Sequence, residues 1–354
     1  MKRVGYIYGK IYDLDNIKNA ILKVSRGKRN QSRVKKILNN IDCYALKIQT
    51  MLKEKTYIPS DYIIKDIVDN SSNKKRTIYK SNFYPDQIIH WCLILQIQSI
   101  ILRGMYFYNC GSVPNKGLSF GKKAISGWLK NDRFGTKYCL KMDISKYYPS
   151  VDNSLLKDSF RRIIKDCNCL WLIDTIIDSC LGLPIGNYTS QWFSNYFLQD
   201  LDYYIKCDLK IKHYIRYVDD MVLLDSNKKK LRNARIKIEQ FLNDKNLELK
   251  SNWQIFQVNK RPIDFLGFIF YRNKIFLRKK LCLRIKRRIK KIYKKKYLSY
   301  KDSCSAVSYF GWMKQARCYN FYFKNVKPFI SIKLCRKVIS NNDKKSNICR
   351  NSRI

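Results

Sequence analysis

Two adjacent aspartates, Asp219 and Asp220, interrupt an apolar run that ends at Leu224. Neighbouring carboxylates repel each other, and a divalent cation is the usual compensation for such a pair. A third aspartate, Asp143, lies in a second apolar run earlier in the chain. Two hydrophobic strands that each deliver aspartates predict a two-metal site for phosphoryl transfer. We expect Asp143 and Asp219 to bridge the metals, Asp220 to assist them, and the carbonyl oxygen of Ile144 to be a further ligand.

The balance of charges indicates the substrate. The chain has 72 Lys and Arg against 27 Asp and Glu, which gives a formal net charge of +45. Such an excess attracts polyanions, so we expect the site to act on nucleic acid. A hydrophobic content of 45% is sufficient for a packed core, and 354 residues allow two or three domains.

One segment concentrates this positive charge. Residues 272–296 contain many Lys and Arg and no acid, and Ile285, Ile289 and Ile292 recur at helical spacing. This pattern predicts an amphipathic basic helix that lies along an anionic surface. A membrane surface would suit such a helix, but the neighbouring strands favour a nucleic-acid duplex. The side chains expected to hold the duplex are Arg284, Arg287, Arg288 and Lys291.

The cysteines and the N-terminus indicate the compartment. The 13 cysteines contain no C-x-x-C pair, and His90 and His213 are the two histidines available to join them. This argues against structural zinc and fits a reducing environment. The N-terminus has no signal-peptide pattern, and the apolar run 88–102 is too short to span a bilayer. We therefore expect a cytoplasmic protein with no membrane partner.

The spacing of apolar residues assigns most of the chain to secondary structure, and the predicted fold class is α+β. Helices are predicted over 1–56, 85–103, 122–130, 154–181, 189–206 and 231–242. Strands are predicted at 62–68, 74–79 and 265–270, with a hairpin at 213–224. Irregular structure is predicted for a polar turn at 70–73, a loop at 104–121 and a loosely ordered end after about 338.

Several segments together resemble reverse transcriptases. KMDISKYY is similar to their first palm motif, YVDD matches their YxDD motif, and FLGF is similar to the primer-grip hairpin. KRTI and DQI are similar to motifs of the fingers, and the order and spacing agree over roughly residues 30–325. The positions in the expected primer grip are Phe265, Leu266 and Gly267.

The resemblance implies a right-hand polymerase with fingers, a palm of antiparallel sheet and helices, and a helical thumb. The implied boundaries are fingers at 1–110 with part of 183–205, palm at 111–275, thumb at 276–340 and a flexible basic tail at 341–354. The implied activity is RNA-directed DNA polymerisation from dNTPs with two Mg²⁺ ions, for which Mn²⁺ is a substitute.

The resemblance also implies contacts to the incoming nucleotide. Lys75 and Arg76 are suited to a clamp on triphosphate oxygens, and a solvated hairpin tip is the alternative. Tyr148 stands where the family places an aromatic steric gate, which clashes with a 2′-hydroxyl and selects dNTPs. Lys250 is the nearest candidate for a general acid on pyrophosphate, although Asn252 and Trp253 occupy the expected place.

The segment LPIGNYTSQ indicates which group of reverse transcriptases the chain resembles. Intron and retroviral enzymes usually have Gln where Ile185 stands and Pro where Gln191 stands. The IGNxTSQ form resembles reverse transcriptases of diversity-generating retroelements, as do segments 110–117 and 308–312.

Ile185, Gly186 and Gln191 are expected to border the nucleotide. A branched aliphatic side chain makes no hydrogen bonds, so the resemblance implies low fidelity opposite template adenines and mutated cDNA that is retrohomed into a variable gene. Met221 departs from the family, where an aromatic residue is common.

The partners implied by this group are a structured template RNA, the RNA–DNA duplex and a small basic helical accessory variability protein, in a bacterial or phage-encoded system. Two alternatives remain. One is another bacterial reverse transcriptase of retron, phage-defence or maturase type. The other is a noncatalytic RNA-binding cofactor, against which the intact aspartates and the intact gate position argue.

Overall fold

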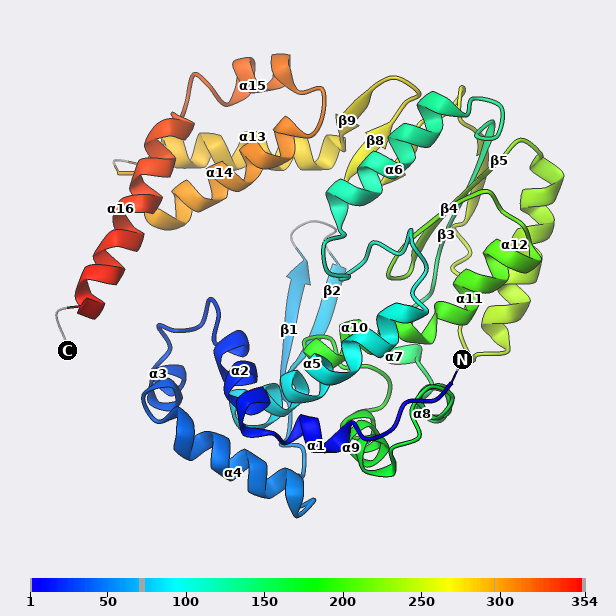
Figure 1. The fold of residues 1–354 in the computed structure, drawn as a ribbon. Helices are drawn as coiled ribbons and strands as arrows, with labels where there is room; N and C mark the ends of the chain where they lie inside the picture. The colour runs from blue at the N-terminus through cyan, green and yellow to red at the C-terminus, as the bar shows by residue number, and fades with distance from the viewer. Residues whose placement is uncertain (1, 70–73, 296, 352–354) are drawn as a thin grey trace. The chain divides into compact units, whose positions relative to one another are not determined.

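The computed structural model describes residues 2–69, 74–295 and 297–351, with side chains to residue 341 except those of Asp69 and Lys74. The predicted polar turn at 70–73 therefore lies outside the described residues. The fold is α+β, and the described residues form helices and three sheets (Figure 1). It divides into two compact units, which we call unit 1 (Met1–Gly117 with Leu140–Ile255) and unit 2 (Leu118–Cys139 with Phe256–Ile354). The predicted boundaries between fingers, palm and thumb differ from this division and stay a prediction.

The first helices of unit 1 pack around α5 (Ile88–Arg103), whose apolar residues are buried on several sides. α2 (Leu14–Val24) lies against it, and Asn16 Nδ2 donates to the Cys92 carbonyl oxygen at 3.2 Å. α2 begins at Asp13, whose carboxylate accepts the first free backbone N–H groups. The other helices here are α1 (Tyr8–Ile11), α3 (Ser32–Asn39) and α4 (Ile41–Lys53). No described helix is both long and apolar enough to cross a bilayer.

A two-stranded hairpin precedes α5 and confirms the strands predicted there. It pairs β1 (Ile63–Asp69) with β2 (Lys74–Lys80) in antiparallel register, and Arg76 lies opposite Ile67. The return strand thus carries the cations, as the sequence predicted. The segment η1 (Phe83–Gln87) links β2 to α5.

The central sheet has the strand order β4-β5-β3-β6. Its strands are β3 (Tyr138–Asp143), β4 (His213–Tyr217), β5 (Asp220–Asp225) and β6 (Gln254–Gln257). β4 and β5 form the predicted hairpin and are mostly buried, because nearly every side chain on them is apolar or bonded inside the core. α12 (Lys228–Asn243) packs against β5, as Figure 1 shows.

Two long predicted helices of unit 1 are shorter in the structure. The prediction over 154–181 divides into α8 (Asn153–Arg161) and α9 (Cys167–Asp178), because Asp166 caps the second helix and also accepts the backbone N–H groups of Ile7 and Tyr8. The prediction over 189–206 divides near Leu198. The segments are α10 (Tyr188–Phe197), α11 (Gln199–Tyr203) and η2 (Tyr204–Asp208), and α7 (Tyr147–Ser150) is a single turn.

Unit 2 combines a three-stranded sheet with helices. β7 (Ile263–Phe265), β8 (Phe268–Phe270) and β9 (Ile275–Leu277) are consecutive antiparallel strands, and α6 (Leu118–Asn131) packs against β8. The helices that follow are α13 (Lys279–Tyr293), α14 (Tyr300–Lys314), α15 (Tyr319–Asn325) and α16 (Ile332–Asn351). α13 confirms the predicted amphipathic helix, because its three isoleucines are buried and most of its cations are exposed.

One expectation for unit 2 needs correction. Residues 265–270 are not one strand, because Leu266 and Gly267 have φ of 54° and 82° and form the turn between β7 and β8. Two consecutive residues with positive φ are typical of a tight hairpin turn. Helix α16 continues to Asn351, into the predicted tail, whose flexibility stays a prediction.

Candidate active site

The turn between β4 and β5 carries the central aspartate. Tyr217 pairs with Asp220 across the hairpin, so Val218 and Asp219 form the turn. The sequence builds this turn from two short apolar strands that are buried in the sheet and leave the acidic residues at its end. Asp219 is half-buried, with its carboxyl group near that of Asp143.

Asp143 is the last residue of β3, and a neighbouring segment holds it from the side. The Lys250 backbone N–H donates to the Asp143 carbonyl oxygen at 2.9 Å, and Ile144 forms a β-bridge with Leu249. The Lys250 ammonium group also donates to Asp143 Oδ2. The Lys250 side chain therefore lies against the carboxylate of Asp143, and its predicted role as a general acid stays a prediction.

The two carboxyl groups perturb each other. Burial raises the pKa of Asp219 to about 6, and the negative charge of Asp143 and a hydrogen bond with it act in the same direction. The charge of Lys250 opposes this effect. Two carboxyl groups held this close carry more negative charge than one ammonium group neutralises.

The donor set fits a hard divalent cation. Asp143 Oδ1 is buried and accepts no hydrogen bond from the described residues. Asp220 lies at the start of β5, with Oδ2 3.8 Å from Lys141 Nζ. Within the described part of the chain, no three His, Cys, Asp or Glu side chains are gathered as a ready metal site. Mg²⁺ is usually held by one or two carboxylates, with waters and substrate phosphates completing its shell, so the Asp143–Asp219 pair suits it.

The raised pKa of Asp219 predicts a pH-dependent response to Mg²⁺. Its ordinary value is 3.8, so the folded protein binds the proton more tightly than the unfolded chain does between about pH 4 and 6. The free energy of unfolding of the metal-free protein therefore falls as the pH rises from about 4 to 6. Mg²⁺ binds the ionised carboxylate, so we expect a small rise in melting temperature at about pH 5 and a larger one at about pH 7.5. An equal rise at both pH values in thermal-unfolding scans would contradict this.

Tyr147 and Tyr148 follow Asp143 in the chain, and their side chains differ in burial. The Tyr147 hydroxyl donates to the Ser194 carbonyl oxygen at 2.5 Å, and the ring is buried. Tyr148 is half-buried, and its hydroxyl accepts from Ser194 Oγ at 3.4 Å. Burial raises the pKa of Tyr148, Ser194 opposes this, and the charges of Asp219 and Arg76 act on the same hydroxyl. The charge of Asp219 also acts on Tyr147, so burial is what separates the two: Tyr147 packs in the core and Tyr148 is half-buried.

The segment with Ile185 is bonded to the hairpin of β1 and β2. The Tyr79 backbone N–H donates to the Ile185 carbonyl oxygen at 2.9 Å. Gly186 adopts φ 136°, and a Cβ there would lie 2.5 Å from the Tyr79 carbonyl oxygen, so only glycine fits. Gln191 is exposed in the first turns of α10. Lys75 and Arg76 are exposed on β2, the strand that holds Ile185.

The remaining predicted residues lie in unit 2. Phe265, Leu266 and Gly267 form the end of β7 and its turn, where a Cβ at Gly267 would lie 3.2 Å from the Trp312 ring. On α13, Arg287 and Lys291 are exposed and Arg284 is half-buried. Arg288 differs, because its guanidinium donates to the buried Asp302 at 2.8 Å inside unit 2.

The sequence reasoning missed a group of buried polar residues beside the aspartate turn, described below. Arg216, Asp202, Asn195 and Asn109 are almost completely buried. A signal was present, because Arg216 is a charged residue inside the apolar strand that leads into YVDD.

The hairpin aspartate Asp219 and the second carboxylate, Asp143 on β3, thus lie close together, and Lys250 contacts Asp143. Residues 110–270 match the family model for reverse transcriptase (RNA-dependent DNA polymerase), so this part of the chain is a reverse transcriptase domain. The domain indicates an RNA-directed DNA polymerase, and its α+β fold is that of a right-hand polymerase. Asp143, Asp219 and Lys250 fall inside the match, whereas Arg76 and α13 fall outside it.

Solved telomerase structures are similar to the chain. Apo telomerase from Candida tropicalis has 13% identity and a TM-score of 0.49, covering 80% of this chain and 56% of that one. The same telomerase truncated from its C-terminal domain has 14% identity and a TM-score of 0.46, covering 65% and 59%. Telomerase from Candida albicans, in complex with a TWJ fragment of telomeric RNA, has 12% identity and a TM-score of 0.47, covering 76% and 57%. The chain thus spans less than two thirds of each. No curated protein matches it.

Proposed function

We propose that the chain is the error-prone reverse transcriptase of a diversity-generating retroelement. It copies a template-repeat RNA into adenine-mutagenised cDNA for retrohoming into a variable gene. The observation that carries this proposal is the place of Ile185. Its carbonyl oxygen accepts a hydrogen bond from β2, the strand that carries Lys75 and Arg76. The charges of Arg76 and Asp219 both act on the Tyr148 hydroxyl.

The proposed chemistry uses Asp143 and Asp219 as ligands of Mg²⁺, with the Ile144 carbonyl oxygen and Asp220 in support. Mg²⁺ bound there would supply Lewis-acid activation of the primer 3′-hydroxyl and charge stabilisation of the leaving pyrophosphate. Lys75 and Arg76 neutralise triphosphate oxygens. Lys250 is held next to Asp143 and is the proton donor for the pyrophosphate.

Ile185 accounts for low fidelity in this proposal. A glutamine at this position offers polar contacts to the nascent pair, whereas isoleucine offers packing alone. Discrimination by shape in an apolar pocket is weak, about 10–200-fold, and discrimination by buried hydrogen bonds is much stronger. Wrong nucleotides are then incorporated more often opposite template adenines.

Ile185→Gln is expected to reduce errors opposite template adenines about tenfold, with smaller changes opposite the other bases. The measurement is sequencing of cDNA made with the cognate RNA, the accessory protein, Mg²⁺ and dNTPs. Ile185→Leu is the matched control, because it keeps an apolar side chain of the same volume and should keep the errors. Accurate cDNA from the unmodified protein would refute the retroelement assignment and leave a retron- or maturase-type polymerase.

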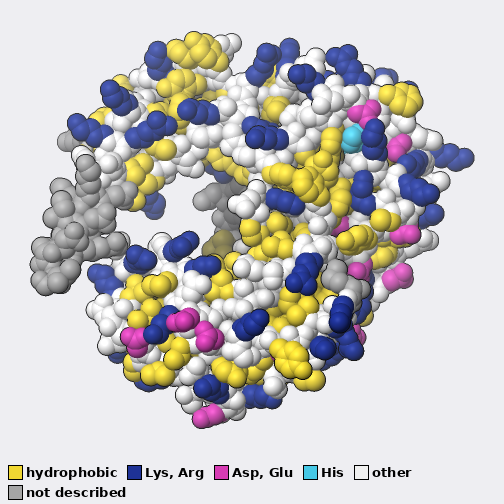
Figure 2. All heavy atoms as spheres, viewed as in Figure 1, with side chains coloured by type: hydrophobic (Ala, Val, Ile, Leu, Met, Phe, Trp, Pro, Cys, Tyr) yellow, Lys and Arg dark blue, Asp and Glu magenta, His cyan; other side chains and the backbone are white. Residues whose placement is uncertain are grey.

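The partners proposed are the template RNA, the RNA–DNA duplex and a small basic accessory protein. Figure 2 shows Lys and Arg spread over the visible face, with few acidic side chains among them. The exposed Arg287 and Lys291 on α13 are proposed to contact duplex phosphates, whereas Arg288 supports the thumb through Asp302.

A further inference from the structure

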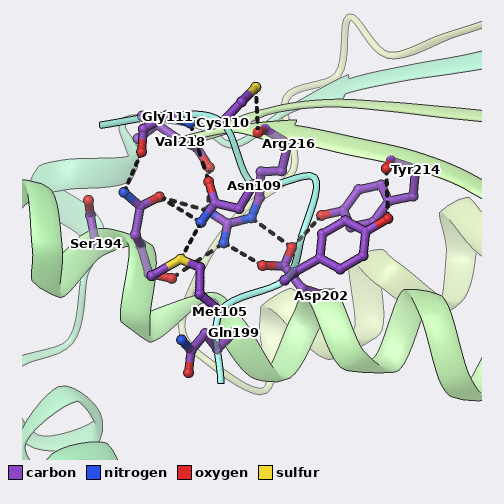
Figure 3. Close-up of polar contacts among 12 residues, drawn as sticks. Met105, Asn109, Cys110, Gly111, Ser194, Gln199, Asp202, Tyr214, Arg216 and Val218 are labelled. Atoms are coloured by element: carbon purple, nitrogen blue, oxygen red, sulfur yellow. Dashed lines mark hydrogen bonds and ion pairs between the residues drawn. The ribbon is translucent and has the colours of Figure 1, made fainter. Parts of the chain in front are cut away.

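A buried ion pair, Arg216 with Asp202, adjoins the turn that carries Asp219. Arg216 lies on β4 and Asp202 on α11, and both side chains are fully buried. Arg216 Nε and Nη2 donate to the two carboxylate oxygens at 2.7 and 2.5 Å (Figure 3). The Tyr214 hydroxyl donates to the same carboxylate at 2.7 Å. This two-pronged contact fixes the plane of the guanidinium group.

The third guanidinium nitrogen reaches the turn itself. Arg216 Nη1 donates to the Val218 carbonyl oxygen at 3.0 Å and to Asn195 Oδ1 at 3.3 Å. The Val218 carbonyl belongs to the peptide group that joins Val218 to Asp219. Holding this oxygen therefore fixes the direction in which the Asp219 side chain leaves the backbone.

Val218 needs such a restraint, because its φ is 57°, a region that β-branched residues rarely adopt. The segment around Gly111 approaches it closely, since a Cβ at Gly111 would lie 2.6 Å from the Val218 nitrogen. Asn195 holds this segment, because its Nδ2 donates to the Gly111 carbonyl oxygen at 2.6 Å and its Oδ1 accepts from Asn109 at 3.1 Å. In Figure 3, Asn109, Gly111 and Arg216 lie around Val218.

Stability alone does not explain the ion pair. The desolvation of two buried charges offsets their attraction, so an apolar pair of similar volume often supports a fold as well. An apolar pair cannot, however, donate a directed hydrogen bond to the Val218 carbonyl oxygen. That bond is the property that distinguishes Arg216 from a packing residue.

We propose that Arg216 is a positioning residue for Asp219. Asp202 orients the guanidinium group, and Arg216 in turn holds the strained Val218 peptide so that Asp219 faces Asp143. The inference rests on the proposed role of Asp219 as a metal ligand.

The test replaces the ion pair by an apolar pair in the full chain, as Arg216→Met with Asp202→Leu. We expect a melting temperature near that of the unmodified protein. The kcat of primer extension should fall about 100-fold at a temperature well below melting, with little change in the KM for dNTPs, because misplacement by about 1 Å costs this much. The rise in melting temperature on adding Mg²⁺ alone should shrink too. A purely structural role predicts neither effect in a folded variant.

Two further variants complete the test. Arg216→Lys keeps the charge and one donor nitrogen, so its kcat should lie between those of the unmodified protein and the double variant. It replaces the double variant in the test if that variant does not fold. Arg161→Met with Asp174→Leu removes an exposed ion pair of 2.7 Å and is the matched control with unchanged kcat.

The proposal is overturned if the folded double variant or Arg216→Lys keeps its kcat and its Mg²⁺ response. It is also overturned if kcat falls only in proportion to the unfolded fraction. Asp219→Ala in the same assay separates the two ideas. Full activity of Asp219→Ala would overturn the proposed role of Asp219 and this inference together. Its inactivity beside an active ion-pair variant would overturn this inference alone.

Discussion

Asp219→Asn is expected to lower the rate of primer extension about a thousandfold or more. Asparagine keeps the shape of the side chain and removes the charge that faces Asp143. A metal ligand that supports the transition state by about 4 kcal/mol corresponds to about a thousandfold in rate. Because the raised pKa of Asp219 shows that its ionised form is disfavoured in the metal-free protein, the variant should fold at least as well as the unmodified chain.

The measurement is single-turnover extension of a primed RNA template with Mg²⁺ and dNTPs, alongside thermal unfolding of each protein. Asp143→Asn should cause a loss of similar size. Asp178→Asn is the control, because this surface carboxylate pairs with Lys157 and has no part in the proposed site. Extension by Asp219→Asn within tenfold of the unmodified protein would show that the turn does not hold a catalytic metal.

The sequence predicted the elements whose signal is local. Local spacing of apolar residues predicted three elements: the YVDD hairpin, the basic helix α13 and the buried helix α5. The approach of Asp143 to Asp219 could be expected because Asp143 ends one buried strand and Asp219 stands in the turn between two others. The family motifs then gave both aspartates a chemical role.

The parts that sequence reasoning missed depend on contacts between distant segments. Residues 265–270 are nearly all apolar and look like one strand, but the positive φ of Leu266 and Gly267, beside the Trp312 ring, makes a turn there. Lys250 reaches Asp143 through the bridge between Ile144 and Leu249, which no local pattern encodes.

The pairing of Arg216 with Asp202 is a further case of this kind. The two residues come from different elements, and their burial follows from packing of α11 against the sheet hairpin rather than from their own polarity. A charged residue inside an apolar strand can be noticed in sequence, but its partner and the peptide oxygen that it holds cannot.

Tyr148→Ala is expected to raise the use of rNTPs relative to dNTPs by about 10–200-fold. In the proposed site the half-buried ring lies beneath the sugar, where a 2′-hydroxyl has no room. Forcing such a group against a packed side chain costs about 1–3 kcal/mol, and removal of the ring removes that cost. Tyr148 is suited to this place because the charges of Asp219 and Arg76 both act on its hydroxyl.

The measurement compares kcat/KM for a dNTP and the matching rNTP on one template. Tyr147→Phe is the paired control, because it removes the hydrogen bond to the Ser194 carbonyl oxygen from the neighbouring buried tyrosine and leaves the Tyr148 ring in place. Its preference for dNTPs should equal that of the unmodified protein. If Tyr148→Ala extends primers with dNTPs and still excludes rNTPs, the gate lies elsewhere. Tyr148 would then be a packing residue, as Tyr147 is.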